Sequence, residues 1–335
     1  MAATVLSEEP SAAFLERFRA LAGPALRLRF DDFLRLALYD PQVGYYRQNR
    51  PRVGYGRGTD FYTASTTGPI FGELICAACA SLLKGAQLSL YTFVEIGAEP
   101  EASVLRGVVH PFGNVRTVRA GEKIDLSGNC VVFSNELFDA QPFRRFVRQS
   151  DRWLELGVEL QGHKLQELQI GEAQSERLPE LPTSLPEGYT LDLPIAAGEL
   201  ASAIAAQPWT GLFLALDYGK SWRELTEATP AGTARAYFRH TQSNNLLARP
   251  GEQDVTCHIC WDWLSDALRI HRFNEPCVES QEAFFIHHAG DLIAATSAAE
   301  AARFSQRKLA LMQLLHPAHL GQKFQALHAV RGDMG

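Results

Sequence analysis

The sequence predicts an α/β protein with a doubly wound, Rossmann-like core, a helical N-terminal cap and an antiparallel β insertion. Three observations predict this fold. Short apolar stretches such as 93–97 and 211–219 end in Gly or Asp, which is typical of buried parallel strands. A helical pattern at 197–207 leads into the second of them. The stretch 143–170 instead alternates apolar and polar residues, with a turn at Gln161-Gly162, as antiparallel hairpins do.

The chain is long enough for one large domain with insertions, or for two domains. It has 335 residues, 46% of them hydrophobic and 21% charged, which is ordinary globular composition. We expect residues 1–87 to form the helical cap and a loop that covers a ligand. Residues 88–142 and 193–335 are expected to form the core, and residues 143–192 the hairpin insertion.

The N-terminal part is predicted to be mainly helical. Apolar residues at 30, 33, 34 and 38 have helical spacing, and Pro41 stops that helix. A second helix is expected at Pro69–Leu83. The stretch 44–65 between them is rich in Gly, Tyr and Arg and has no apolar periodicity, so it is predicted to be a loop.

The core elements follow in order. The apolar stretch 88–97 predicts a strand, and Pro100 between two glutamates favours a helix start directly after it. Further strands are expected at 114–121, 129–140, 211–219, 233–240 and 282–290, helices at 197–207 and 260–270, and a mostly helical segment at 297–330.

Charge and composition exclude several function classes. The net charge of −6, from 38 acidic and 32 basic residues, gives no positive field for a nucleic acid partner. Arg144, Arg145 and Arg148 are interpreted as a solvated strand edge. The longest apolar run, 74–83, is too short to span a bilayer. The first residues are acidic where a signal peptide is basic. We therefore expect a cytoplasmic protein without a membrane partner.

Four cysteines have a spacing that can bind zinc. Cys76-x-x-Cys79 and Cys257-x-x-Cys260 could form two knuckles. The pairs lie far apart, however, and the first belongs to a predicted helix, where Cys is a common buried apolar residue. We expect buried thiols and no metal.

Polar residues follow the predicted parallel strands where each strand ends. In doubly wound sheets, ligands bind beyond the carboxyl ends of the strands. The ends to consider are Glu95–Gly97, Ser134–Glu136, Asp217–Gly219 and the turn after Phe285. Carboxylates such as Glu136 and Asp139 match a guanidinium group, although Asn and Asp at these places can also cap the next turn.

Six fragments in order resemble the MidA-type family of class I S-adenosylmethionine-dependent methyltransferases. They are "DDFLRLALYDPQVGYY", "GRGTDFYTASTTGPIFGEL", "SNELFDAQPFRRFV", "LALDYG", "TARAYFRHTQSNNLLARPGEQDVTCHI" and "HLGQKFQAL". The family includes a mitochondrial complex I assembly methyltransferase that modifies arginine on a protein subunit. The resemblance covers about residues 30–327.

The resemblance implies a role for each matching position. It implies S-adenosylmethionine binding by Gly58, Asp60, Phe61, Thr63, Glu95 and Gly97. It implies catalysis by Asn135, Glu136, Asp139 and His258. It implies substrate binding by Glu73, Asp217, Tyr218, Arg235, Tyr237 and Asp254. The implied partner is a protein substrate or an assembly partner, and a homo-oligomer stays open.

The cofactor half of the pattern departs from the family. Glu99 and Glu101 stand where the family has glycines, and Pro100 removes a backbone donor. The interval from Gly97 to Asn135 is also short. We interpret 114–121 as the third strand, so that the second strand and its ribose-binding acid are missing. Glu122 would supply that acid if 114–121 took the second strand's place.

Two main functions are therefore predicted, with one further possibility. One is a methyltransferase acting on a protein arginine or a similar nitrogen. The alternative is a catalytically inactive methyltransferase fold that holds a partner segment in the acceptor cleft. A different small ligand in a remodelled pocket is a third.

Overall fold

The computed structural model describes residues 8–50, 52–54, 59–60, 64–98, 103–173, 178–302 and 305–332. The chain forms two compact units. The first comprises Met1–Arg50, Ala140–Ala197 and Lys220–His258, and the second comprises Pro51–Asp139, Gly198–Gly219 and Ile259–Gly335. The domain boundaries expected from the sequence, at residues 87, 142 and 193, stay a prediction.

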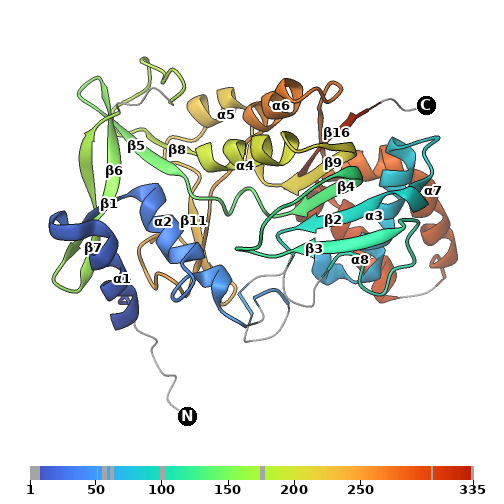
Figure 1. Cartoon of the computed structure of the whole chain (residues 1–335), viewed down its shortest axis with the longest axis horizontal. Helices are drawn as coiled ribbons and strands as arrows, with labels where there is room; N and C mark the ends of the chain where they lie inside the picture. The colour runs from blue at the N-terminus through green and yellow to red at the C-terminus, as the bar shows by residue number, and fades with distance from the viewer. Residues whose placement is uncertain are drawn as a thin grey trace, which may run out of the picture. The chain divides into compact units, whose positions relative to one another are not determined.

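The second unit is built on a six-stranded sheet (Figure 1). Its order is β15 (Cys277–Ser280), β16 (Gln325–Arg331), β9 (Trp209–Asp217), β4 (Gly128–Asn135), β2 (Thr92–Ile96) and β3 (Asn114–Val118). The four strands from β9 to β3 are parallel, and β16 runs antiparallel to both of its neighbours. The predicted core of parallel strands is confirmed.

Helices cover both faces of this sheet. The helices α3 (Pro69–Leu82), α7 (Gln281–Ala299) and α8 (Gln306–Leu315) share one apolar core with Phe93, Phe133 and Leu214 of the strands. On β16, Ala326 and Val330 face this core, whereas Gln325 accepts a hydrogen bond from Trp261 at the start of α6 (Trp261–Ile270). Because side chains alternate along a strand, α6 lies on the opposite face, and the sheet is doubly wound.

The first unit carries the antiparallel insertion. Strands β6 (Arg152–Gln161) and β7 (Lys164–Glu172) form the predicted hairpin, with Gly162 at φ +63 in its turn. The other strands of this sheet are β1 (Arg27–Arg29), β5 (Arg144–Gln149) and β8 (Thr190–Leu193). Helices α1 (Ala12–Ala22) and α2 (Phe30–Tyr39) flank β1 in the chain, and β1 pairs with β6.

A smaller sheet and several short elements complete the two units. The antiparallel strands β12 (Thr241–Ser243), β11 (Arg235–Phe238) and β13 (Asp254–Thr256) belong to the first unit. The remaining elements are α4 (Ile195–Ala205), α5 (Trp222–Glu227), β10 (Gly219–Lys220), β14 (Ile259–Cys260), η1 (Gly23–Ala25), η2 (Tyr45–Arg47), η3 (Ala64–Thr67), η4 (Leu88–Leu90) and η5 (Pro317–Gly321). Within the described ranges, every helix is too short or too polar to span a bilayer.

The three arginines of β5 are not a solvated edge. Arg144 is buried and makes a two-pronged ion pair with Glu155, with both N···O distances 2.7 Å. Arg145 pairs with Asp192 at 2.6 Å, and Arg148 donates to the carbonyl of Thr183. The prediction failed because strand alternation in a sequence does not reveal which acids lie across from the basic residues.

Two predicted elements have the wrong type. The stretch 282–290 belongs to helix α7 rather than to a strand, so no strand end follows Phe285. A short apolar run fits a buried helix as well as a strand, and Phe284 and Phe285 are both fully buried. Residues 325–331, expected to be helical, form strand β16 instead. Residues 103–110 form turns and coil rather than the expected helix.

The strand at 114–118 takes the second strand's place. It pairs in parallel register directly with β2, from Thr92–Asn114 to Ile96–Val118. In the 3-2-1 order of such sheets, the neighbour of the first strand is the second strand. The interpretation of this segment as the third strand was therefore wrong. The strand that the short interval between Gly97 and Asn135 leaves out is therefore the outer, third strand.

Candidate functional site at the carboxyl ends of the parallel strands

Asp217 organises the turn that follows β4. It is fully buried at the end of β9. Its Oδ2 accepts hydrogen bonds from the backbone N–H groups of Leu137 and Phe138, at 3.2 and 2.8 Å. The N–H groups of Asp139 and Tyr218 also bond to this carboxyl. Burial nevertheless raises the pKa of Asp217 to about 7. This residue, expected to bind substrate, is thus occupied in shaping the turn.

Asn135 and Glu136 are the polar residues that this turn presents. Glu136 has φ +52, a conformation that residues other than Gly rarely adopt, and it is half-buried. Asn135 donates to Glu136 Oε1 at 3.1 Å, and its own Oδ1 is buried without a hydrogen-bond partner. Backbone strain of this kind concentrates at functional sites, so this pair is the part of the site that packing alone does not explain.

Asp139 and Tyr218 lie beside this turn. Asp139 is buried, and its backbone N–H belongs to the set that bonds to Asp217. Tyr218 is partly exposed and packs its ring on Phe324, with the ring centroids 4.0 Å apart. Asn135, Glu136, Asp139, Asp217 and Tyr218 are therefore brought together, as the predicted strand ends required.

Glu95 at the end of β2 is bound within its own chain. Its carboxyl accepts from Ser103 Oγ at 2.7 Å and from the Val104 N–H at 3.0 and 3.1 Å. Burial raises its pKa to about 7, although these hydrogen bonds oppose the shift. The predicted cofactor acid therefore anchors residues 103–104, where the chain leaves the strand.

Gly97 follows with φ +83, a conformation suited to glycine. Its N–H donates to the carbonyl of Val118 at 2.8 Å. A Cβ at this position would lie 2.9 Å from Leu137 Cδ1. Glycine is therefore favoured at position 97 by the positive φ, and a larger residue would also displace the side chain of Leu137 in the turn after β4.

The environment of Glu95 predicts a pH effect on stability. Its folded-state pKa is raised above the value of 4.5 for an unperturbed glutamate, so its contribution is present below that value and lost as the pH rises through about 7. We expect the wild type to lose about 2 kcal/mol relative to Glu95→Gln between pH 5 and pH 8. Urea unfolding of both proteins at the two pH values measures this. A constant difference would contradict the prediction.

The end of β3 carries no free acid of its own. Arg119 follows the strand directly, and its backbone N–H donates to Glu122 Oε2 at 2.8 Å. Glu122 is exposed and closes a turn back to the carbonyl of Arg119. The strand β3 holds the second strand's position, which would make Glu122 the ribose-binding acid. In this structure, however, the Glu122 carboxylate accepts a hydrogen bond within its own turn.

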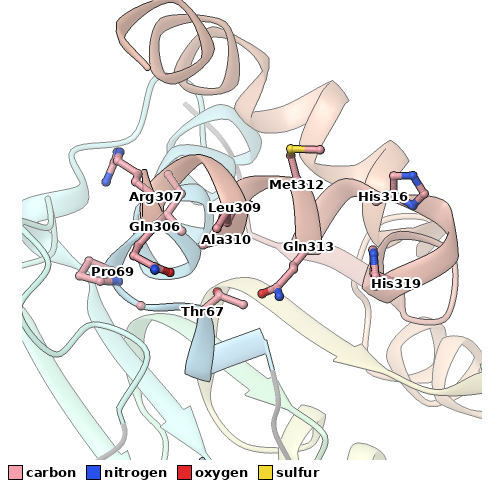
Figure 2. Close-up of a pocket in the computed structure, with 12 residues that line it drawn as sticks. Thr67, Pro69, Gln306, Arg307, Leu309, Ala310, Met312, Gln313, His316 and His319 are labelled. Carbon is pink, nitrogen blue, oxygen red and sulfur yellow. The ribbon is translucent and has the colours of Figure 1, made fainter. Parts of the chain in front are cut away.

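Glu73 on α3 is paired with Arg307 of α8. Arg307 donates through two nitrogens to the two carboxylate oxygens of Glu73. Arg307 also lines a groove of about 800 Å³ between the start of α3 and helix α8. Figure 2 shows Thr67 and Pro69 on one side of this groove and Gln306 and Gln313 on the other. The expected substrate ligand therefore already has a guanidinium partner in its own chain.

Part of the predicted cofactor loop can be placed. Asp60 is buried, and its N–H donates to the carbonyl of Arg52 at 2.7 Å. Gly58, Phe61 and Thr63 lie outside the described residues, as do Glu99, Pro100 and Glu101. The roles proposed for these six residues stay predictions.

The remaining candidates belong to the first unit. Asp254 on β13 lies opposite Tyr237 on β11, is buried, and accepts from the Tyr46 hydroxyl at 2.8 Å. Arg235, also on β11, pairs with Thr256 and donates to the carbonyl of Ala234. The β11–β13 pair therefore brings Arg235, Tyr237 and Asp254 onto one small sheet.

His258 follows β13. Burial is the main cause that lowers its pKa to about 4, and the positive charges of Lys220 and Arg235 lower it further. Its Nδ1 is buried without a hydrogen-bond partner. At neutral pH the imidazole is therefore uncharged, and a pKa this low makes it a weak base.

Sequence reasoning missed Asp192. Its side chain is buried on β8, accepts from the N–H groups of Thr233 and Ala234, and pairs with Arg145. It shapes the start of the β11 region as Asp217 shapes the turn after β4. The signal was present in the sequence: a lone acid inside the apolar strand "TLDL" needs buried partners.

The six cysteines form no disulfide, and five of them are buried. All six are free thiols, and Cys76, Cys79, Cys257 and Cys260 are buried, as expected. Burial is the main cause that raises the pKa values of Cys76 and Cys260 to about 12. These thiols are protonated at neutral pH.

The doubly wound sheet with one antiparallel strand, and polar strand ends at β4 and β9, define a protein of the class I methyltransferase architecture. The chain belongs to the family described as "Putative S-adenosyl-L-methionine-dependent methyltransferase", whose model matches residues 108–275. The predicted family resemblance is thereby confirmed.

Two solved structures from Burkholderia thailandensis share this fold. The first, a candidate methyl transferase bound to S-adenosyl-homocysteine, has a TM-score of 0.80 at 22% identity. The second, an uncharacterized protein, has a TM-score of 0.77 at 21% identity. Each alignment covers 97% of this chain and 95% of the other. At these identities the likeness bears on the fold.

A curated relative is "Protein arginine methyltransferase NDUFAF7, mitochondrial" of Danio rerio. It is 23% identical over 292 residues, which are 70% of this chain and 66% of the relative. The chain thus spans slightly less than two thirds of the length of that relative.

Proposed function

We propose that this protein is an S-adenosylmethionine-dependent methyltransferase that acts on a protein arginine or a similar nitrogen. The observation that carries the proposal is the strained Glu136 with its hydrogen-bonded neighbour Asn135, at the carboxyl end of β4 in a chain of this family. The curated relative, named a protein arginine methyltransferase, supports the substrate class.

Glu136 is the proposed ligand of the substrate guanidinium. A carboxylate accepts two parallel hydrogen bonds from this planar group, which orients one nitrogen. Asn135 holds Glu136 through the hydrogen bond to Oε1. Asp217 fixes both residues indirectly, because it holds the backbone of residues 137–139. We also propose a catalytic role for His258, which belongs to the first unit and is uncharged at neutral pH.

The residues of the second unit fit the cofactor in part. Asn135 Oδ1 is a buried acceptor that lacks a donor, which suits the ammonium or hydroxyl groups of S-adenosylmethionine. Gly97 keeps the conformation that a cofactor turn needs. When bound, the cofactor supplies an electrophilic methyl group. The proposed cofactor residues on this chain are Gly58, Asp60, Phe61, Thr63, Glu95 and Gly97.

Calorimetry with S-adenosylmethionine and S-adenosylhomocysteine tests the proposal. We expect one cofactor to bind per chain with micromolar affinity, and Asn135→Leu to weaken binding at least about tenfold, because a donor group of the bound cofactor loses its acceptor. Asn129→Leu is the matched control, since this exposed asparagine lies at the other end of β4. No heat with either compound at millimolar concentration would refute the enzyme.

A second function has its own support. Glu95 is consumed within the chain, Arg119 rather than an acid follows β3, and Leu137 lies against Gly97. These features suit a methyltransferase fold that holds a partner segment without transferring a methyl group. The calorimetric result separates the two, since only this alternative predicts the absence of cofactor binding.

The proposed partner is a protein, as substrate or as assembly partner, rather than a nucleic acid or a membrane, and a homo-oligomer stays open. Six free thiols support a reducing compartment. We propose the cytoplasm, whereas the name of the curated relative places that protein in the mitochondrion.

A further inference from the structure

Five potential metal ligands gather at the edge of the sheet in the second unit. Cys277 and Glu279 lie on the edge strand β15, two residues apart and therefore on one face. His328 on β16 is the direct cross-strand partner of Cys277. His287 and His288 come from α7, which covers this face.

The ligand atoms converge on the carboxylate of Glu279. Its Oε1 lies 3.2 Å from His328 Nε2 and 3.3 Å from His288 Nε2, and its Oε2 contacts His287 Nδ1. Three ligand atoms lie within 4.8 Å of one another, and Cys277, Glu279 and His328 supply one each. No other such group of three was found among the described residues.

These distances match the edges of a coordination tetrahedron. With metal–nitrogen and metal–oxygen bonds of about 2.1 Å, neighbouring ligand atoms are about 3.4 Å apart. The two Glu279–histidine distances are close to that value without any movement. Cys277 is exposed, so its thiol can rotate, and an ion can enter from solvent.

We propose that Cys277, Glu279 and His328 bind a zinc ion, with His288 within reach as a fourth ligand. Thiolate, imidazole and carboxylate form the mixed set that Zn²⁺ accepts. Binding displaces the proton of the Cys277 thiol, and the thiolate sulfur then donates an electron pair to the metal. The ion ties the edge strand β15 to β16 and α7.

The bare cluster is a hydrogen-bond network that leaves one of its members, Cys277, out. A neutral histidine donates through one ring nitrogen, and Glu279 faces three imidazoles while Cys277 beside it has no use in that network. A zinc ion bound here is coordinated by the sulfur of Cys277 and by a carboxylate oxygen of Glu279, so that the thiol becomes part of the cluster.

The test uses the full chain, stripped with a chelator and kept reduced. Calorimetry with Zn²⁺ is expected to give one ion per chain, with proton release seen as a dependence of the heat on the buffer. Cys277→Ser and Glu279→Gln should each weaken binding about 100-fold. His319→Ala, at an exposed histidine of η5, is the matched control and should change nothing.

Cobalt substitution gives a second readout. Co²⁺ bound to a thiolate shows a sulfur-to-metal charge-transfer band in the near ultraviolet, which Cys277→Ser should abolish. Because Cys277 is exposed, this variant is expected to fold, and circular dichroism checks it. Stoichiometric binding without the thiolate band, binding unchanged in Cys277→Ser, or no binding at micromolar Zn²⁺ would each overturn the proposal.

Discussion

Replacing Asp217 by alanine is expected to destabilise the second unit by about 4 kcal/mol. The carboxyl is fully buried and accepts hydrogen bonds from the backbone N–H groups of residues 137, 138, 139 and 218. Its removal leaves several buried donors without an acceptor, and each such donor costs about 1–3 kcal/mol. Relaxation of the turn and entry of water reduce the total cost of these unsatisfied donors, but the loss of stability still exceeds that of most substitutions.

Hydrogen exchange of the β4 and β9 amides measures this loss where it occurs. The two units need not unfold together, so a global melting curve would mix their contributions. Asp217→Asn should lose less than Asp217→Ala, because the amide keeps one acceptor oxygen. Asp125→Ala, at an exposed aspartate of the same unit, should stay within about 0.5 kcal/mol of the wild type. Equal protection in Asp217→Ala and the wild type would contradict this role.

Asp217 also shows why a strand-end position alone does not define a ligand. The apolar runs at 92–96, 128–135 and 209–217 predict parallel strands, and parallel strands bring their carboxyl ends to one edge. That much follows from local pattern. Whether an acid at such an end faces a ligand or caps a neighbouring turn depends on which backbone donors lie opposite, and those come from residues about 80 positions away.

The failures elsewhere have the same origin. The sequence 282–290 is apolar enough for a strand, and only the arrangement of β15, α7 and β16 decides that it is a helix. The place of 114–118 beside β2 was misjudged because chain order was taken as sheet order. The arginines of β5 find their acids on β6 and β8 through pairing that no local pattern encodes.

Replacing Glu136 by glycine is expected to raise stability and abolish methyl transfer. At φ +52 the glutamate backbone is strained, and glycine relieves this by about 1 kcal/mol. The same change removes the carboxylate proposed to orient the substrate guanidinium. Loss of that orientation should reduce transfer about 100-fold or more. A residue that is kept for its function although it lowers stability is expected to behave in this way: its replacement raises stability and lowers activity.

Two companion variants isolate the causes. Glu136→Gln keeps the strained backbone and removes only the charge, so it should lose activity without gaining stability. Arg272→Gly, at an exposed residue with φ +62 in the same unit, should gain stability without losing activity. Stability of the second unit comes from hydrogen exchange of the β4 amides, and activity from tritiated methyl groups on arginine after incubation of a protein extract with labelled S-adenosylmethionine. If Glu136→Gln kept full activity while the wild type methylated arginine, the carboxylate would have no part in orienting the substrate, and the strain at residue 136 would need another explanation.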